Sequence, residues 1–154
     1  MSAFDGATVL IVDEDPRQRE RLSAALAEEA GRVLRVQNET EAINCLMSTQ
    51  VDILIAPLRS PHVDGGKLLR LAQDLYEHTA VILMVDSDAL EADSAVRLML
   101  DGANDTLTRP VNTERLRAIV RRILRQQEIV RERDSLRTQL QHPAEMLGFT
   151  ARLA

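Results

Sequence analysis

Aromatic side chains, cysteines and long apolar runs are all scarce in this chain. Aromatic residues make up only 2% of the 154 residues, so the core has to be packed from Leu, Ile, Val, Ala and Met. Cys45 is the only cysteine, which excludes an internal disulfide and suits a cytoplasmic protein. No apolar run approaches the ~18 residues of a membrane span, so we expect neither a membrane segment nor a signal peptide.

Charge is distributed unevenly along the chain. Residues 1–113 carry 10 basic and 19 acidic side chains, whereas residues 114–154 carry 9 basic and 5 acidic ones. Hydrophobic residues at 45% and charged residues at 28% fit one soluble globular domain. The sequence therefore predicts an acidic body followed by a basic tail.

Short apolar segments alternate with helical patterns along the acidic body. The apolar segments are too short for helices and predict buried strands at 7–12, 33–36, 52–56, 80–85 and 103–107. The first helix begins with Asp15 as N-cap followed by Pro16, and Gly31 ends it. Strands that alternate with helices in this way indicate βαβ units and a parallel sheet. We therefore predict an α/β fold, a flavodoxin-like doubly wound five-stranded parallel sheet.

The last helical segment is too long for this fold. From Thr113 no helix breaker occurs until Pro143, and 28 helical residues would span about 42 Å. Because an isolated helix of this kind is marginal in water, we expect a short coiled-coil homodimer. The apolar positions assigned to its seam are Ile119, Ile123, Val130, Leu136 and Leu140. The expected organisation is a domain at 1–125, a helical extension at 126–142 and a linker or tail at 143–154.

Four spaced segments of the sequence carry a family resemblance. They are an apolar strand with an acidic pair at 9–16, the stretch from Asp52 to Gly65, the apolar strand at 80–85 and the segment 101–110 that closes on Arg109-Pro110. In this order and spacing they resemble the response-regulator receiver (CheY-like) domain family, over about residues 7–125. The resemblance implies a cis peptide bond before Pro110.

Several residues depart from the pattern of that family at the positions where its chemistry takes place. In an active receiver an acidic pair and an acceptor aspartate hold Mg²⁺, and a lysine and a strand hydroxyl contact the phosphoryl group. Asp13 and Glu14 match the acidic pair, with Asp15 beside them in the acidic pocket. Pro57 stands at the acceptor position, Val85 at the hydroxyl position, Thr106 at the aromatic switch position and Arg109 at the lysine position.

Each of three departures removes a different part of the reaction. Pro57 has no oxygen nucleophile and cannot form an acyl phosphate. Val85 cannot donate a hydrogen bond, and Arg109 keeps the charge of lysine on a larger planar group. The resemblance therefore implies a degenerate pseudo-receiver rather than an enzyme, with no catalytic residue.

The remaining acidic pocket allows two interpretations. Asp13 and Glu14 repel each other and need a cation, so Mg²⁺ with these two carboxylates as weak ligand candidates is one interpretation. The other, which we favour, is a salt bridge to Arg109 and no cofactor. Asp15 is expected to act as a helix cap rather than as a ligand.

The favoured function is a phosphorylation-independent signalling module that regulates a partner protein or a fused output domain. One alternative is nucleic-acid binding through the basic helix, where Arg117, Arg121 and Arg125 line one side. The interleaved acidic residues argue against direct binding of nucleic acid. Another alternative is that the chain is the regulatory fragment of a transcription activator, because residues 146–152 resemble a linker in that class. A nucleotide- or flavin-dependent enzyme is disfavoured, since no glycine-rich phosphate loop is present.

Overall fold

A computed structural model describes residues 6–141, apart from the side chains of residues 89, 90 and 139–141. The strands are β1 (Thr8–Val12), β2 (Arg32–Val36), β3 (Ile53–Pro57), β4 (Arg59–Ser60), β5 (Val63–Asp64), β6 (Ala80–Val85) and β7 (Asp105–Thr108). The helices are α1 (Pro16–Leu26), α2 (Glu39–Ser48), α3 (Gly65–Leu75), α4 (Ala89–Leu100) and α5 (Thr113–Gln141).

Five of the strands form one parallel sheet in the order β2-β1-β3-β6-β7. β1 lies between β2 and β3, and after β2 the chain crosses to the other side of β1 and continues through β3 and β6. This is the predicted flavodoxin-like doubly wound order, with its switch point between β1 and β3. The fold expectation is confirmed.

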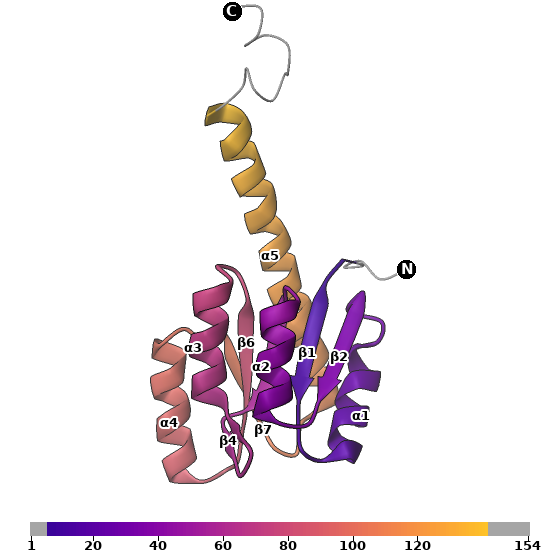
Figure 1. Ribbon diagram of the computed structural model, residues 1–154, viewed down its shortest axis with the longest axis vertical. Helices are drawn as coiled ribbons and strands as arrows, with labels where there is room; N and C mark the ends of the chain where they lie inside the picture. The colour runs from indigo at the N-terminus through magenta and orange to yellow at the C-terminus, as the bar shows by residue number, and fades with distance from the viewer. Residues whose placement is uncertain (1–5, 142–154) are drawn as a thin grey trace, which may run out of the picture.

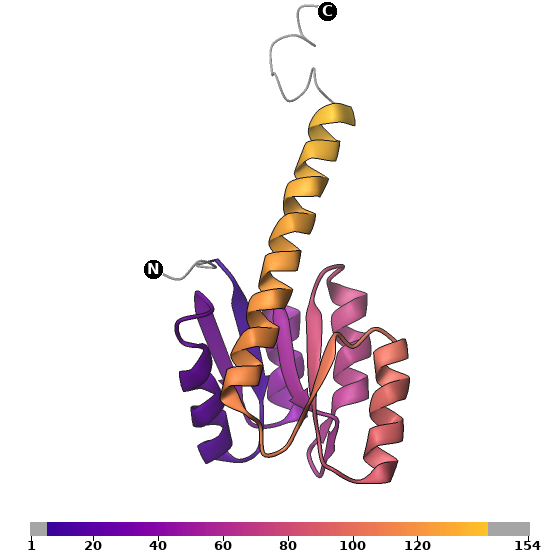
Figure 2. The same ribbon diagram turned by 180° about the vertical axis from the view of Figure 1, so that it is seen from behind.

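Helices cover both faces of the sheet (Figures 1 and 2). Alternate residues of each strand enter two separate cores. One core packs the sheet against α1 and α5, and the other packs it against α2, α3 and α4. In β1, for example, Ile11 enters the first core and Leu10 the second, and both are fully buried. A strand buried on both faces reads as a continuous apolar run, which is why the sequence pattern identified these strands.

The helix starts follow the capping signals in the sequence. Asp15 accepts a hydrogen bond from the backbone N–H of Arg17 at 2.9 Å and caps α1, as predicted. Asn38 caps α2 in the same way. The boundaries differ by a few residues elsewhere: α1 ends at Leu26 rather than near Gly31. The short antiparallel pair β4–β5 was not predicted, because two-residue strands carry almost no periodic signal.

α5 is continuous and projects beyond the sheet (Figure 1). Its first part lies in the core, where Ile119 is 6% exposed and Ile123 is 3% exposed. The assignment of Ile119 and Ile123 to a dimer seam is therefore wrong, because their apolar stripe belongs to the domain's own core. Val130 is half-buried and Leu136 is 59% exposed, while the side chain of Leu140 and the expected tail at 143–154 lie outside the described part.

Beyond this core, polar side chains hold α5 to the body. Gln127 donates from Nε2 to the carbonyl oxygens of Asp52 and His78, at 2.8 and 2.9 Å. Arg131 pairs with the carboxylate of Asp52, and Asp134 lies 3.5 Å from Nε2 of His78. Asp52 and His78 precede β3 and β6, so the extension is fixed at the amino-terminal edge of the sheet.

Candidate functional site

The sequence-predicted site residues gather at the carboxyl-terminal edge of the sheet. Asp13 and Glu14 follow β1, Pro57 and Val85 end β3 and β6, and Arg109 follows β7. Because the strands are parallel, these ends meet along one edge, next to the switch point. This edge is the one opposite to that from which α5 projects (Figure 2).

Pro57 is buried at the end of the central strand. The N–H of Leu58 donates to the carbonyl of Met84 at 2.8 Å, so by strand alternation the nitrogen of Pro57 faces β1. The pairing of β1 with β3 ends at Ile11 and Ile55. The missing N–H of proline thus coincides with the end of this ladder, a position at which a sheet tolerates the residue.

Glu14 is held by the β4–β5 hairpin. Its Oε1 accepts a hydrogen bond from Oγ of Ser60 at 2.6 Å and another from the backbone N–H of His62 at 2.9 Å. The hydrogen bond from Ser60, followed by that from His62, lowers the pKa of the Glu14 carboxyl. Glu39 of α2 fastens the other side of the hairpin by accepting from the N–H of Asp64 at 3.0 Å. Glu14 is thus a structural anchor, a role that the sequence pattern did not indicate.

Asp13 is the deepest carboxylate of the pocket, with 6% of its surface exposed. Its Oδ1 accepts from the N–H of Asp15 at 3.0 Å, while its Oδ2 is buried without a hydrogen-bond partner in the described part of the chain. Burial raises the pKa of Asp13, although the hydrogen bond from Asp15 and the charge of Arg109 act in the opposite direction. A cavity of about 320 Å³ lies between the segment that follows β1 and the segment that follows β7. It is lined by Asp13, Asp15, Gln18, Arg109 and Pro110.

The expected salt bridge between the acidic pair and Arg109 is not formed. Arg109 instead pairs with Asp86, with 3.8 Å between Nε and Oδ1. Glu14 is turned away toward the hairpin, which explains why it does not reach the guanidinium. Within residues 6–141, Nε and Nη2 of Arg109 are buried and have no hydrogen-bond partner. The peptide bond between Arg109 and Pro110 is cis, as expected.

The two switch positions hold side chains of limited chemistry. Val85 is 7% exposed and packs in the core beneath α4, and its carbonyl accepts from the N–H of Arg109 at 2.8 Å. Thr106 is half-buried on β7 and lies in register with Leu83. The strand hydroxyl that the resemblance leads one to expect at Val85 is absent, and so is the aromatic ring expected at Thr106.

The residues present are a poor fit for Mg²⁺. A hard cation needs several oxygen ligands, and the two candidate carboxylates supply few: Oδ1 of Asp13 and Oε1 of Glu14 already accept hydrogen bonds. Pro57 supplies no side-chain oxygen. Among the described residues, no three acidic, histidine or cysteine side chains are arranged to hold a metal ion.

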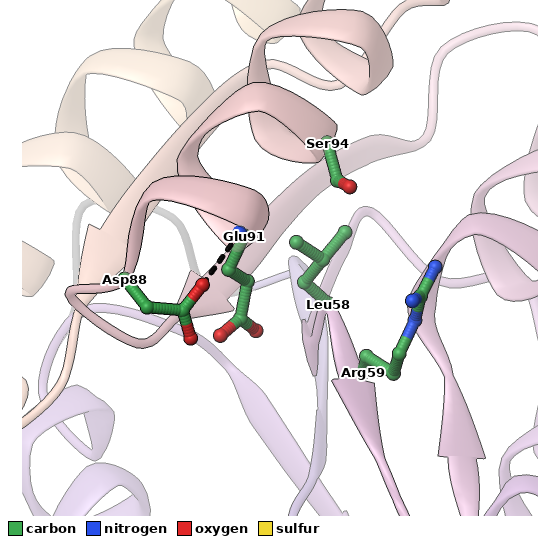
Figure 3. Close-up of a pocket in the computed structure, with 5 residues that line it drawn as sticks. All are labelled: Leu58, Arg59, Asp88, Glu91 and Ser94. Carbon is green, nitrogen blue, oxygen red and sulfur yellow. Dashed lines mark hydrogen bonds between the residues drawn. The ribbon is translucent and has the colours of Figure 1, made fainter.

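A second cavity of about 340 Å³ lies beside this edge, between the residues that follow β3 and the first turns of α4 (Figure 3). Leu58 and Arg59 line one side, and Asp88, Glu91 and Ser94 line the other. Asp88 caps α4 by accepting from the N–H of Glu91 at 2.7 Å. Both acidic residues of this cavity therefore serve the start of α4, because Glu91 also accepts from the N–H of Asp86 at 3.1 Å.

Residues 9–121 match the family described as the response regulator receiver domain. The chain belongs to this family. Among curated relatives, the transcriptional regulatory protein KdpE of Staphylococcus aureus is 30% identical over 76% of this receiver chain and 49% of its own length. The DNA-binding transcriptional regulator NtrC of Proteus hauseri is 27% identical over 91% of this chain and 29% of its own length.

Solved structures share the receiver fold. A response regulator receiver domain protein from Clostridium thermocellum has a TM-score of 0.73 at 22% identity, covering 80% of this chain and 98% of that one. The signal receiver domain of a putative Luxo repressor protein from Vibrio parahaemolyticus has a TM-score of 0.71 at 24% identity, covering 80% and 94%. The likeness to these structures shows the fold alone.

The receiver chain spans between about a quarter and a half of the length of the curated relatives it matches. Within the described residues, no helix is both long enough and apolar enough to cross a membrane.

Proposed function

We propose that this protein is a pseudo-receiver, a regulatory module that acts without phosphorylation. The observation that carries this proposal is Pro57, whose hydrocarbon ring lies at the end of β3 where the family resemblance expects the acceptor carboxylate. A proline offers no oxygen to attack a phosphodonor. The surrounding groups support the same conclusion, since Glu14 is committed to the hairpin and Arg109 pairs with Asp86.

The output of such a module is a change in protein association. We propose that it regulates a partner protein or a fused output domain and that it dimerises through the extension of α5. Several relatives are named as transcriptional regulators, which favours an output in transcription. Exposed apolar side chains on α4, at Val96 and Leu100, give a partner a surface to contact.

Direct nucleic-acid binding is the weaker candidate. Arg121 of the basic stripe forms an ion pair with Glu29, and the neighbouring Arg122 pairs with Asp105. Side chains engaged in this way are less available to phosphates. We therefore assign the basic character of α5 to packing and association.

The decisive test is incubation of the full chain with a small phosphodonor and Mg²⁺, followed by intact mass spectrometry. We expect the mass of the wild-type chain to stay unchanged. The variant Pro57→Asp restores a carboxylate at the end of β3, and combined with Val85→Thr and Arg109→Lys it is expected to gain one phosphoryl group. A receiver with an intact acceptor, treated in parallel, shows that the donor is active. A phosphoryl adduct on the wild-type chain would refute the proposal.

A further inference from the structure

The extension of α5 has its polar and apolar faces inverted. The side chains that bond to the body are Gln127, Arg131 and Asp134, with only the half-buried Val130 as an apolar neighbour. The apolar side chains Ile129 and Leu136 are 50% and 59% exposed. A helix that packs only on its own domain normally turns its apolar face inward. Here the apolar face is left for something else to cover.

Helical geometry places the two faces on opposite sides. Successive residues are rotated by about 100°, so two positions amount to about 200°. Ile129 is two positions from both Gln127 and Arg131, and Leu136 is two positions from Asp134. Ile129 and Leu136 are seven positions apart and lie on one line, as in a heptad seam. The ion pair between Arg131 and Asp52 keeps this line pointing away from the body.

The charges that flank this line have opposite signs on its two sides. At about 100° per residue, Glu128 and Glu132 lie on one side of the line through Ile129 and Leu136. Arg133 and Arg137 lie on the other side. All four side chains are exposed, and no ion pair within residues 6–141 engages them.

This arrangement distinguishes the two ways in which a second copy could cover the apolar line. In a parallel pair, the acidic flank of one helix faces the basic flank of the other, so that Glu128 meets Arg133 and Glu132 meets Arg137 of the second copy. In an antiparallel pair, acidic faces acidic and basic faces basic. Like charges placed opposite each other are unfavourable, so the parallel pair is selected.

We propose that two copies of this chain associate in parallel through the outer face of α5, with Ile129 against Ile129 and Leu136 against Leu136. This inference rests on the proposed dimerisation and adds its orientation and register. The paired segment is short, so the dimer is weak and depends on concentration. Both bodies lie at the same end of the pair, which sets two candidate sites at a fixed spacing.

Disulfide cross-linking of the full chain tests the orientation. In a Cys45→Ser background, Ile129→Cys and Leu136→Cys are each expected to form covalent dimers with themselves on mild oxidation. A mixture of the two variants is expected to give no disulfide between Cys at 129 and Cys at 136. The control Ser135→Cys, one position away from the line, is expected to cross-link much less.

The possible results separate the orientation from the dimer itself. Disulfides formed only in the mixture would show an antiparallel pair, which overturns this inference and leaves the proposed dimer standing. No disulfide in any sample, together with a monomeric mass by light scattering at high concentration, overturns both. Phosphodonor labelling is independent of either result.

Charge reversal gives a second readout that does not alter the apolar line. Glu132→Arg and Arg137→Glu are each expected to weaken association roughly three- to tenfold, because every dimer loses two exposed ion pairs and gains like-charge contacts. The double variant restores the pairing of opposite charges and is expected to associate like the wild type. Arg115→Glu, on the body part of α5, is the matched control. Failure of the double variant to recover would contradict the parallel register.

Discussion

Gly65 opens α3, and a side chain there would have no room. A Cβ at this position would lie 2.3 Å from the carbonyl oxygen of Pro57 and 3.0 Å from Cα of Leu58. Both obstacles are backbone atoms and cannot rotate away. The N–H of Gly65 also donates to the carbonyl of Leu58 at 3.0 Å, which closes the loop tightly. The glycine thus allows the start of α3 to pack directly against the end of β3.

Gly65→Ala is expected to lower the free energy of unfolding by about 1–3 kcal/mol, because the backbone has to move to admit the methyl group. Gly66→Ala is the matched control, since its nearest neighbour is Oδ1 of Asp64 at 3.4 Å. Alanine is also the better helix former, so this variant should be neutral or slightly more stable. Urea unfolding of the two variants checks the difference. Equal stability would mean that the close approach at Gly65 is not a constraint.

At the scale of elements, a partly buried ion pair ties the end of α1 to α5. Glu29 follows α1 and is 8% exposed. Arg121 donates to it from Nε and Nη2, at 2.8 and 2.6 Å. These hydrogen bonds lower the pKa of Glu29 below its ordinary value of 4.5. A carboxylate whose pKa is lowered by folding stabilises the fold at pH values above its ordinary pKa. This stabilisation is lost as the pH falls through the lowered pKa of the folded state.

Glu29→Gln is therefore expected to lower the free energy of unfolding at neutral pH by on the order of 1 kcal/mol. The deficit relative to wild type should shrink as the pH falls below 4.5. Glu20→Gln is the control, because Glu20 pairs with Arg35 at 2.6 Å with side chains that are 70% and 49% exposed. Exposed pairs contribute little, so this variant should match wild type. Thermal unfolding across pH measures both, and a deficit that grows in acid would contradict the assignment.

For the molecule as a whole, the fold could be predicted because both faces of the sheet are covered. Strands such as β1 and β3 are buried throughout and almost entirely apolar, and cap residues such as Asp15 mark the helix starts. Contacts between side chains from separate loops could not be predicted in this way. Nothing near Glu14 in the sequence indicates Ser60 as its partner, and nothing near Arg109 indicates Asp86.

The apolar pattern of α5 was misleading for a related reason. The apolar residues of α5 lie on two different faces, and the face that includes Ile123 is covered by the domain's own sheet and α1. Ile129 and Leu136 lie on the opposite face, beyond the core, and remain exposed. Periodicity reports that a face is buried and does not report what buries it.

At the amino-terminal edge of the sheet, one buried carboxylate contacts both β1 and the extension of α5. Asp52 accepts from the N–H of Thr8 at 2.7 Å and pairs with Arg131, so it links the start of β1 to the extension. Asp52→Asn keeps an oxygen for Thr8 but removes the charge that holds Arg131. Hydrogen exchange at residues 127–138 is expected to rise at least severalfold, while exchange at 116–124 in the core is expected to stay unchanged, because local opening follows local contacts. Ser135→Ala is the control on the same helix, and unchanged exchange in Asp52→Asn would show that the extension does not depend on this ion pair.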